Sequence, residues 1–353
     1  MRNRFNPLLV RISILFVLLI PFLVVFIIDY FRVPELDAEI ERVPLVIPRG
    51  TSIGTIVDSL YAKGLVEDKE LFVLWLTTMD KDRAIKAGFY EIPRGLTYAQ
   101  LVSYLSQATS KEIKVTLIEG WRTTEIAAEL ADKLQIDEQK IIDLTRNITL
   151  IRSLNITENN LEGYLLPDTY HFYWGVSEEK IIEFLVNECL SIFSDTVMMR
   201  LDSMKMTVHQ ILTLASIVEG EAIYDDERAI VASVYYNRLR KRIKLQADPT
   251  IQYILNGPPR RLLYKDLAID SPYNTYMYYG LPPGPISNPG KNSIMAAIYP
   301  AKTDYIYFVA RGDGRHTFSR TAAEHQRAKA EFDQVRREVY RKRRSSNLKR
   351  DTQ

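Results

Sequence analysis

A charge-free stretch near the start of the chain constrains its architecture most. The seventeen residues from Ile12 to Ile28 carry no charge, and Arg2, Arg4 and Arg11 precede them. A helix over residues 12–31, rising about 1.5 Å per residue, would reach across the roughly 30 Å hydrocarbon core of a bilayer. The positive flank predicts that residues 1–11 stay in the cytoplasm as a short tail. The sequence thus predicts one membrane span, with the body of the protein outside the cytoplasm.

A cleaved signal peptide is the alternative interpretation of this stretch. It requires a shorter apolar core followed by small residues at a cleavage site, and residues 24–33 offer no such site. The uncleaved anchor is therefore favoured. Residues 32–44, which include Pro34, are predicted to form a short stalk between membrane and body.

The remaining composition limits the classes of function. About 320 residues after the span suggest two domains. Lys and Arg number 46 against 44 Asp and Glu, so the charge balance gives no electrostatic case for nucleic acid as a partner. Cys189 is the only cysteine, and the four histidines are widely spread, so we expect no disulfide, no metal site and no cofactor.

The first predicted domain, residues 45–110, is a small α/β module. Thr51 is predicted to cap its first helix and Gly64 to end it, while Thr97 opens its last helix. The predicted order is strand 45–48, helix 51–63, helix 69–78, strand 88–92 and a helix from 97. This order resembles the LysM-like module that binds glycan chains, although a spacer domain without a ligand fits it equally.

The second predicted domain, residues 111–340, mixes strands and helices, and the predicted fold class is α+β. A basic tail at 341–353 follows it. Residues 161–170 and the proline-rich residues 280–290 are predicted to be irregular. The predicted elements are strands at 115–118 and 305–309 and helices at 123–134, 178–193, 201–219, 226–240 and from 322.

Glu219 is the main candidate for chemistry. It follows the apolar run 211–218, and Gly220 is predicted to end the helix beside it. Burial and the negative end of the helix dipole would both raise the pKa of Glu219, as a general acid near neutral pH requires. The alternative is a structural glutamate that pairs with Arg228 or Arg238 and braces two helices.

Glu221 is not expected to share a helical face with Glu219. Residues two apart point about 200° from each other on a helix. Hydrolysis by two carboxylates would therefore need Glu221 to leave the helix, or a distant acid such as Asp248 or Glu162. One acid suffices if the nucleophile belongs to the substrate.

Downstream amides, hydroxyls and aromatic rings would suit a sugar, because rings stack on its apolar face and amides bind its polar groups. Asp248 and Asn274 could equally be turn residues beside proline. No P-loop, G-x-G-x-x-G, G-x-S-x-G or H-E-x-x-H motif is present, which excludes the commonest nucleotide-binding, hydrolase and metalloprotease interpretations. The candidate supporting residues of this group are Asn237, Gln246, Asp248, Thr250, Tyr273, Asn274 and Thr275.

Six motifs occur in one order and together resemble the endolytic murein transglycosylase family, also called YceG-like. The resemblance covers roughly residues 45–328. In the family's S-I-V-E-x-E motif the first glutamate is catalytic, which corresponds to Glu219, and the position after it is often Lys but is Gly220 here. The six motifs are Leu161–Tyr170, Ala215–Glu221, Leu245–Thr250, Tyr273–Tyr276, Gly280–Ile286 and His316–Phe318.

The resemblance implies a bacterial lytic transglycosylase. Such enzymes cut the bond between N-acetylmuramic acid and N-acetylglucosamine without water, because the 6-hydroxyl of the muramic acid closes on its own C1. Glu219 would protonate the leaving oxygen and then take the proton of that hydroxyl. Glu162, Glu221 and His316 would support it. The implied partners are peptidoglycan strands, the plasma membrane and wall synthases; a glycan-binding scaffold without activity and a two-carboxylate hydrolase are the rivals.

Overall fold

The computed structural model describes residues 41–47, 50–79, 85, 88–107, 112–255, 257–334 and 337. The chain divides into two compact units, Met1–Ile113 with His171–Val176 and Lys114–Tyr170 with Ser177–Gln353. The predicted cytoplasmic tail, the membrane span at 12–31 and the basic tail at 341–353 lie outside the described residues. Within the described ranges, no helix combines the length and apolar character needed to cross a bilayer.

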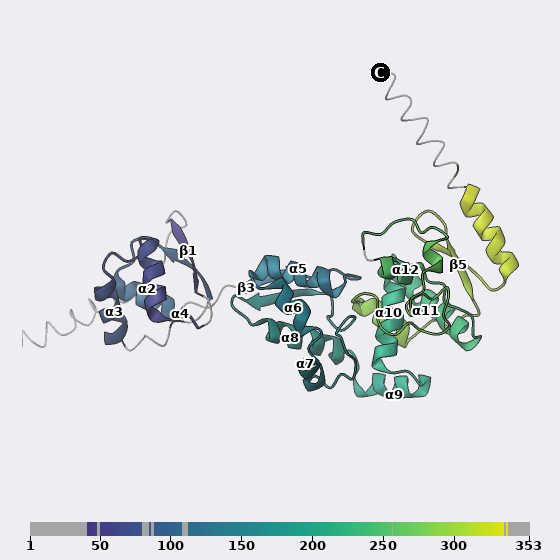
Figure 1. The fold of residues 1–353 in the computed structure, drawn as a ribbon, viewed down its shortest axis with the longest axis horizontal. Coiled ribbons are helices and arrows are strands. Elements are labelled where there is room, and N and C mark those ends of the chain that lie inside the picture. Colours follow the sequence, from purple (N-terminus) through teal and green to yellow (C-terminus); the bar gives the residue numbers. More distant parts are fainter. Residues whose placement is uncertain are drawn as a thin grey trace, which may run out of the picture. The chain divides into compact units, whose positions relative to one another are not determined.

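The first unit packs helices against a pair of antiparallel strands (Figure 1). Alternate residues of the first strand are buried, and Leu45 lies opposite Tyr90 in the register. Leu60, Phe72 and Leu101 from successive helices are fully or almost fully buried in the same core. The elements are β1 (Arg42–Ile47), α2 (Ile53–Ala62), α3 (Lys69–Thr78), β2 (Gly88–Pro93) and α4 (Tyr98–Gln107).

Local capping explains where these helices begin. Ser52, not the predicted Thr51, caps α2, since its side chain accepts a hydrogen bond from Thr55 N at 3.2 Å. Thr97 and Gln100 form the reciprocal bonds of a capping box at the start of α4. The order predicted for this unit is therefore observed, with the first cap displaced by one residue. The first strand begins at Arg42, so the last residues of the predicted stalk belong to β1.

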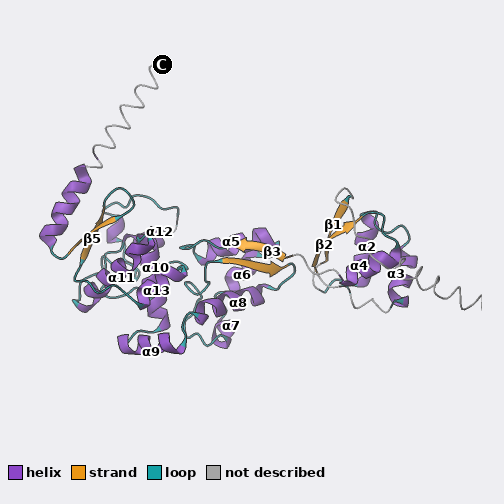
Figure 2. Cartoon of the chain, turned by 180° about the vertical axis from the view of Figure 1, so that it is seen from behind, coloured by secondary structure: helices purple, strands orange, loops and turns teal. Residues whose placement is uncertain are grey.

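The second unit is mainly helical, with short paired strands (Figure 2). Its fold confirms the predicted α+β class. Residues 322–334 are helical as predicted. Two strands, β3 (Glu112–Thr116) and β4 (Thr169–Tyr173), have residues in both units. The other elements are α5 (Thr123–Leu134), α6 (Glu138–Leu144), α7 (Ile148–Ser153), α8 (Glu178–Ser191), α9 (Asp195–Met204), α10 (Val208–Glu221), α11 (Asp225–Arg240), α12 (Asp248–Leu255), η1 (Asp266–Ala268), α13 (Lys291–Ile298), β5 (Tyr307–Ala310) and β6 (His316–Ser319).

One predicted helix is wrong. Residues 201–219 are not continuous, because Lys205 adopts the left-handed conformation with φ of 55° and ends α9. Thr207 then caps α10 and forms a capping box with Gln210. A non-glycine residue at a left-handed position carries little sequence signal, so the apolar periodicity alone predicted one continuous helix where the structure has two.

The core of the second unit surrounds α10, which contacts α11, α12 and α13. All eight residues from Ile211 to Val218 are buried. This burial on every face fixes the helix firmly, and its C-terminal end carries Glu219 and Glu221. The site is therefore built on one of the most enclosed elements of the chain.

Candidate active site

Glu219 and Glu221 both lie within α10, which continues through Glu221 and has Ala222 as its C-cap. The prediction that Gly220 ends the helix is therefore wrong. Gly220 is needed for close packing: a Cβ atom at this position would lie 2.7 Å from Cβ of Pro249 in α12. The two glutamates contact different groups, as expected for residues about 200° apart around a helix.

Glu219 is held at both carboxylate oxygens. Arg228 Nη1 lies 2.7 Å from Oε1, and the backbone N–H of Gly290 donates to Oε2 at 2.9 Å. The Glu219 side chain is only 6% exposed. A cation and a backbone donor both stabilise an ionised carboxylate, so this arrangement suits a group that accepts a proton.

Arg228 organises the charges around Glu219. Its side chain is 7% exposed, and besides Glu219 it donates to Asp225 Oδ1 at 2.9 Å and to Ser293 Oγ at 2.5 Å. Its Nη2 lies 3.7 Å from Glu119 Oε2. The alternative pairing of Glu219 with Arg228 is thus the geometry observed. Arg238 instead donates to the carbonyl oxygens of Leu245 and Ile306.

Glu221 lies in a different environment. The hydroxyl of Tyr235 donates to its Oε1 at 3.0 Å, and no described cation forms an ion pair with it. Burial raises the pKa of Glu221 to about 7, and the charge of Asp248 also raises it. Asp248 accepts a hydrogen bond from the Tyr276 hydroxyl at 2.5 Å. Glu221 therefore has the weakly acidic character that the sequence analysis expected of Glu219.

A cavity of about 330 Å³ opens beside Glu221, Gln246, Asp248 and His316. The His316 side chain is 9% exposed, and its Nδ1 lies 2.8 Å from Glu227 Oε2. If Nδ1 carries the proton, Nε2 of the neutral ring is left as an acceptor. The cavity thus brings an acid, an amide and an imidazole together.

Glu162 belongs to a separate arrangement. Its Oε1 accepts bonds from Thr123 N and from Asn288 Nδ2, both at 3.0 Å. Burial raises the pKa of Glu162 to about 7. Glu162 also borders a second cavity, of about 310 Å³. Asn288 is fully buried, and its Oδ1 accepts bonds from the backbone N–H groups of Gly163 and Leu165.

Several other predicted supporting residues make contacts that hold the backbone. Asn274 is fully buried, and its Nδ2 donates to the carbonyl oxygens of Leu267 and Ile269. Thr250 and Thr275 are buried with their hydroxyls 2.9 Å apart. The structure thus supports the alternative of a turn residue for Asn274.

Asn237 and Tyr273 also contact neighbouring protein groups. Asn237 Nδ2 donates to the carbonyl oxygens of Thr303 and Tyr305, both at 2.8 Å. The ring of Tyr273 packs at 4.8 Å between centroids against Tyr253. The amide group of Asn237 therefore holds the backbone at residues 303 and 305, and the ring of Tyr273 packs on another protein ring.

Sequence reasoning missed Glu119, Arg228 as an organiser, Glu227 and Asn288. Gly120 and Gly290 were the available signals: Gly120 has φ of 81°, and a Cβ atom on Gly290 would lie 2.0 Å from Glu119 Oε1. Among the described residues, no group of three or more His, Cys, Asp or Glu side chains is placed to hold a metal ion.

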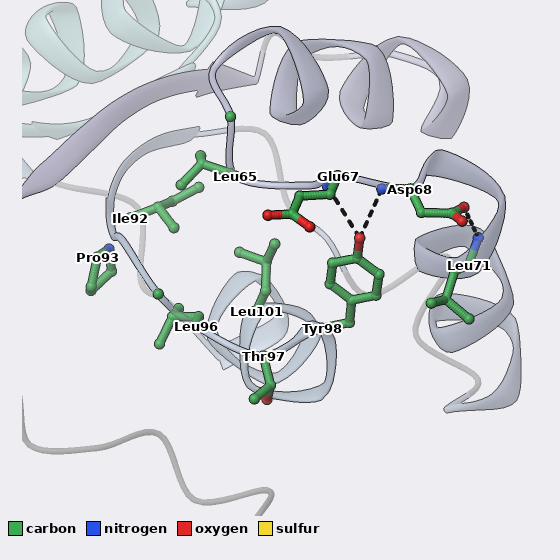
Figure 3. A pocket seen from close by; sticks show the side chains of 12 residues that line it. Leu65, Glu67, Asp68, Leu71, Ile92, Pro93, Leu96, Thr97, Tyr98 and Leu101 are labelled. Carbon is green, nitrogen blue, oxygen red and sulfur yellow. Dashed lines mark hydrogen bonds between the residues drawn. The ribbon is translucent and has the colours of Figure 1, made fainter.

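The first unit contains its own cavity, of about 420 Å³ (Figure 3). The Tyr98 hydroxyl accepts hydrogen bonds from the backbone N–H groups of Glu67 and Asp68, at 3.1 and 2.8 Å. Leu71 and Leu96 line the same cavity. It therefore presents apolar side chains and two carboxylates around a phenol ring whose hydroxyl is already engaged.

Comparison with known proteins places the chain among a defined set of relatives. The model of the YceG-like family matches residues 45–331. The chain is 36% identical over 302 residues to an endolytic murein transglycosylase of Bacillus subtilis (strain 168), covering 81% of this chain and 83% of that relative. It is 29% identical to an endolytic murein transglycosylase of Streptococcus pneumoniae (strain ATCC BAA-255 / R6), covering 84% of this chain but 59% of that relative.

A solved structure agrees with this relationship. The crystal structure of a putative yceG-like protein from Listeria monocytogenes superposes with a TM-score of 0.57 at 34% sequence identity. The match covers 81% of this chain and 98% of that one. The structural similarity therefore extends over most of this chain, and the range matched by the family model includes Glu219.

Proposed function

The chain belongs to the YceG-like family, and from this membership we propose that it is an endolytic lytic transglycosylase that cuts peptidoglycan. This membership confirms the family predicted from the six sequence motifs. The observation that carries the proposal is that Glu219 is held by Arg228 and the N–H of Gly290 at the end of a buried helix. We propose that this residue is the catalytic glutamate, as the S-I-V-E-x-E motif predicts.

The proposed reaction breaks the bond between C1 of N-acetylmuramic acid and the oxygen of N-acetylglucosamine. The 6-hydroxyl of the muramic acid forms the new bond to C1 and leaves a 1,6-anhydro end. Glu219 acts on the protons of this exchange, and its paired carboxylate suits removal of the hydroxyl proton. The acetamido group of the substrate shields the charge that develops at C1.

The cavity beside Glu221 is proposed to hold a sugar unit of the same strand. Gln246, Asp248 and His316 supply an amide, a carboxylate and an imidazole that can bind hydroxyl and acetamido groups. Glu162, Tyr273 and the residues that hold the backbone near them are proposed to shape the remaining groove. The buried positions of Asn237, Thr250, Asn274 and Thr275 support this indirect role.

We propose that residues 12–31 anchor the enzyme in the plasma membrane with the N-terminus in the cytoplasm and the predicted catalytic domain, 111–340, outside. Tethering would favour nascent strands, since it raises the local concentration of enzyme only within the reach of the proposed stalk that precedes β1. Cutting there would end strand elongation close to the peptidoglycan synthases.

Residues 45–110 are proposed to form a LysM-like module that contacts the strand. The cavity at Tyr98, with its leucines and carboxylates, supports a ligand surface, whereas a spacer domain is the alternative. Binding of chitooligosaccharide to the described module, followed by its tryptophan and tyrosine fluorescence, separates these two interpretations. A module that binds no oligosaccharide at millimolar concentration would be a spacer.

Mass spectrometry of digested glycan strands tests the proposed reaction. A lytic transglycosylase leaves 1,6-anhydro ends, a hydrolase leaves reducing ends, and a glycan-binding scaffold leaves the strands uncut. The main rival enzyme is a hydrolase in which Glu219 acts with Asp248 or Glu221. Reducing ends from the full-length protein would favour that rival.

A further inference from the structure

We propose that Glu119 is a second catalytic carboxyl, which gives a proton to the leaving oxygen while Glu219 takes the proton of the attacking hydroxyl. This inference rests on the proposed function and assigns one of its two proton transfers to a residue outside the S-I-V-E-x-E motif. It follows from four features: the nearness of the two carboxyls, their unequal exposure, the anchoring of Glu119 and the charges around it.

The two carboxyls are close neighbours. Glu119 Oε1 lies 2.0 Å from the position that a Cβ atom on Gly290 would occupy, and Gly290 N lies 2.9 Å from Glu219 Oε2. These contacts and the backbone geometry of Gly290 hold the two oxygens within about 7 Å of each other. Paired carboxyls of glycoside-cleaving enzymes act on one bond across gaps of about 5–9.5 Å.

Glu119 is the more accessible of the two carboxyls. Its side chain is 45% exposed, compared with 6% for Glu219. Both carboxylate oxygens of Glu219 accept hydrogen bonds, one from Arg228 and one from Gly290 N. Glu119 lies 3.7 Å from Arg228 and has no closer ion pair among the described residues. The leaving oxygen of a bound substrate can therefore reach Glu119 directly.

The segment that carries Glu119 is fixed. Gly120 N donates to Asn288 O at 2.9 Å, and Asn288 N donates to Trp121 O at 2.8 Å. These backbone bonds attach the turn after β3 to the residues just before Gly290. A Cβ atom on Gly120 would lie 3.5 Å from Glu219 Cγ, so this turn packs directly on the catalytic side chain. The backbone bonds between residues 120–121 and Asn288 thus fix the position of the segment that carries Glu119.

The surrounding charges favour the protonated form of Glu119. Burial and the Glu219 carboxylate raise the pKa of Glu119, and Arg228 partly offsets them. Asp225 of α11 and Asp168, just before β4, raise it further. Arg228 lies 2.7 Å from Glu219 but 3.7 Å from Glu119, so its positive charge offsets the rise in the pKa of Glu119 only in part.

Atoms and protons balance in this scheme. The bond from C1 to the leaving oxygen breaks, the bond from C1 to O6 forms, Glu119 loses one proton and Glu219 gains one. Transfer of that proton from Glu219 back to Glu119, either directly between the two carboxyls or through a water molecule, restores both groups. No oxidant, metal or water molecule is consumed.

The test compares two substrates, because an acid is needed only when the leaving group is poor. Glu119→Gln should slow cleavage of glycan strands about 100-fold, but should slow release of 4-nitrophenolate from a 4-nitrophenyl glycoside of N-acetylmuramic acid less than fivefold. Glu179→Gln is the matched control, since Glu179 is 43% exposed and lies 3.5 Å from Lys140. This control should leave both rates unchanged.

Equal loss on both substrates, or normal cleavage of strands by Glu119→Gln, would overturn the assignment of Glu119. Strand cleavage by Glu219→Gln at a normal rate would instead overturn the proposed function, so the two failures are distinguishable. If Glu119→Gln does not fold, Gly290→Ala serves as the second variant, because its Cβ displaces Glu119 without changing a charge. It should show the same loss on strands with the aryl glycoside spared.

Discussion

The two carboxyls at the end of α10 stand two residues apart, yet their surroundings differ in kind. Glu219 meets a guanidinium and a backbone N–H, whereas Glu221 meets a tyrosine hydroxyl and a neighbouring carboxylate. Both are largely removed from solvent. Burial raises the pKa of Glu221, and the hydrogen bond from Tyr235 of α11 only partly offsets this effect, whereas the same helix supplies the guanidinium of Arg228 to Glu219.

The sharpest test of this difference is Glu219→Gln. The amide keeps the shape of the side chain but cannot exchange a proton, so cleavage of glycan strands should fall about 10²–10⁴-fold. Release of anhydro ends, measured by mass spectrometry, gives the rate. Near-normal turnover with a folded protein would remove Glu219 from the reaction.

Arg228→Met should have the next largest effect, on stability. It leaves Glu219 buried without its cation, which costs about 3 kcal/mol in the free energy of unfolding. Urea denaturation measures this loss. The double variant Arg228→Met, Glu219→Gln should recover a large part of it, because no uncompensated charge then remains; equal losses in the single and double variants would contradict the charge argument.

Glu221→Gln should change how stability depends on pH. The folded protein holds the pKa of Glu221 near 7, above the unfolded value near 4.5, so the neutral form is favoured by the fold. The corresponding stability is complete below about pH 4.5 and is lost as pH rises through 7, by up to about 3 kcal/mol.

The variant should lack this contribution, so its stability should decline less than that of the parent between pH 4 and 8, with the decline due to Glu162 remaining. Urea denaturation at each pH would show the difference. Glu183→Gln, at an exposed position of α8, is the control and should follow the parent protein. A Glu221→Gln curve that parallels the parent would mean that Glu221 is already ionised in the folded protein.

Gly220→Ala should have the smallest effect of the set. Alanine favours a helix interior by about 1 kcal/mol over glycine, but its Cβ would lie 2.7 Å from Pro249. Overpacking of this kind costs about 1–3 kcal/mol, so we expect a slight net loss of thermal stability, together with a small shift of α12. A gain in stability would show that α12 moves away freely.

Local signals predicted the helices well and the site only in part. The helices at 69–78, 178–191 and 225–240 follow from periodicity over several turns, which depends on neighbouring residues alone. Glu219 stood out because a carboxylate after an apolar run is unusual. The helix α12 was missed, although Pro249 suits a first helical turn, because its apolar period is short.

The partners of Glu219 could not be predicted in the same way. Gly290 and Glu119 reach it from segments 71 and 100 positions away along the chain, and no local pattern encodes such a meeting. Arg228 lay within reach of spacing arguments, since it follows nine residues later on the next helix. Even so, spacing predicted only a structural ion pair between Arg228 and Glu219, because no sequence pattern indicates that Glu119 also lies near Arg228.

The hydrogen bonds of Asn288 have a consequence for the time at which the enzyme becomes active. They join residues 121 and 288, which are 167 positions apart, and Gly290 follows two residues later. Closing so long a loop is slow, and it cannot occur before the ribosome has released the later segment. A chain that is still being synthesised therefore carries Glu219 without its backbone donor. The contacts that hold the Glu219 carboxylate form only after nearly the whole second unit has been synthesised, so an unfinished chain lacks this arrangement.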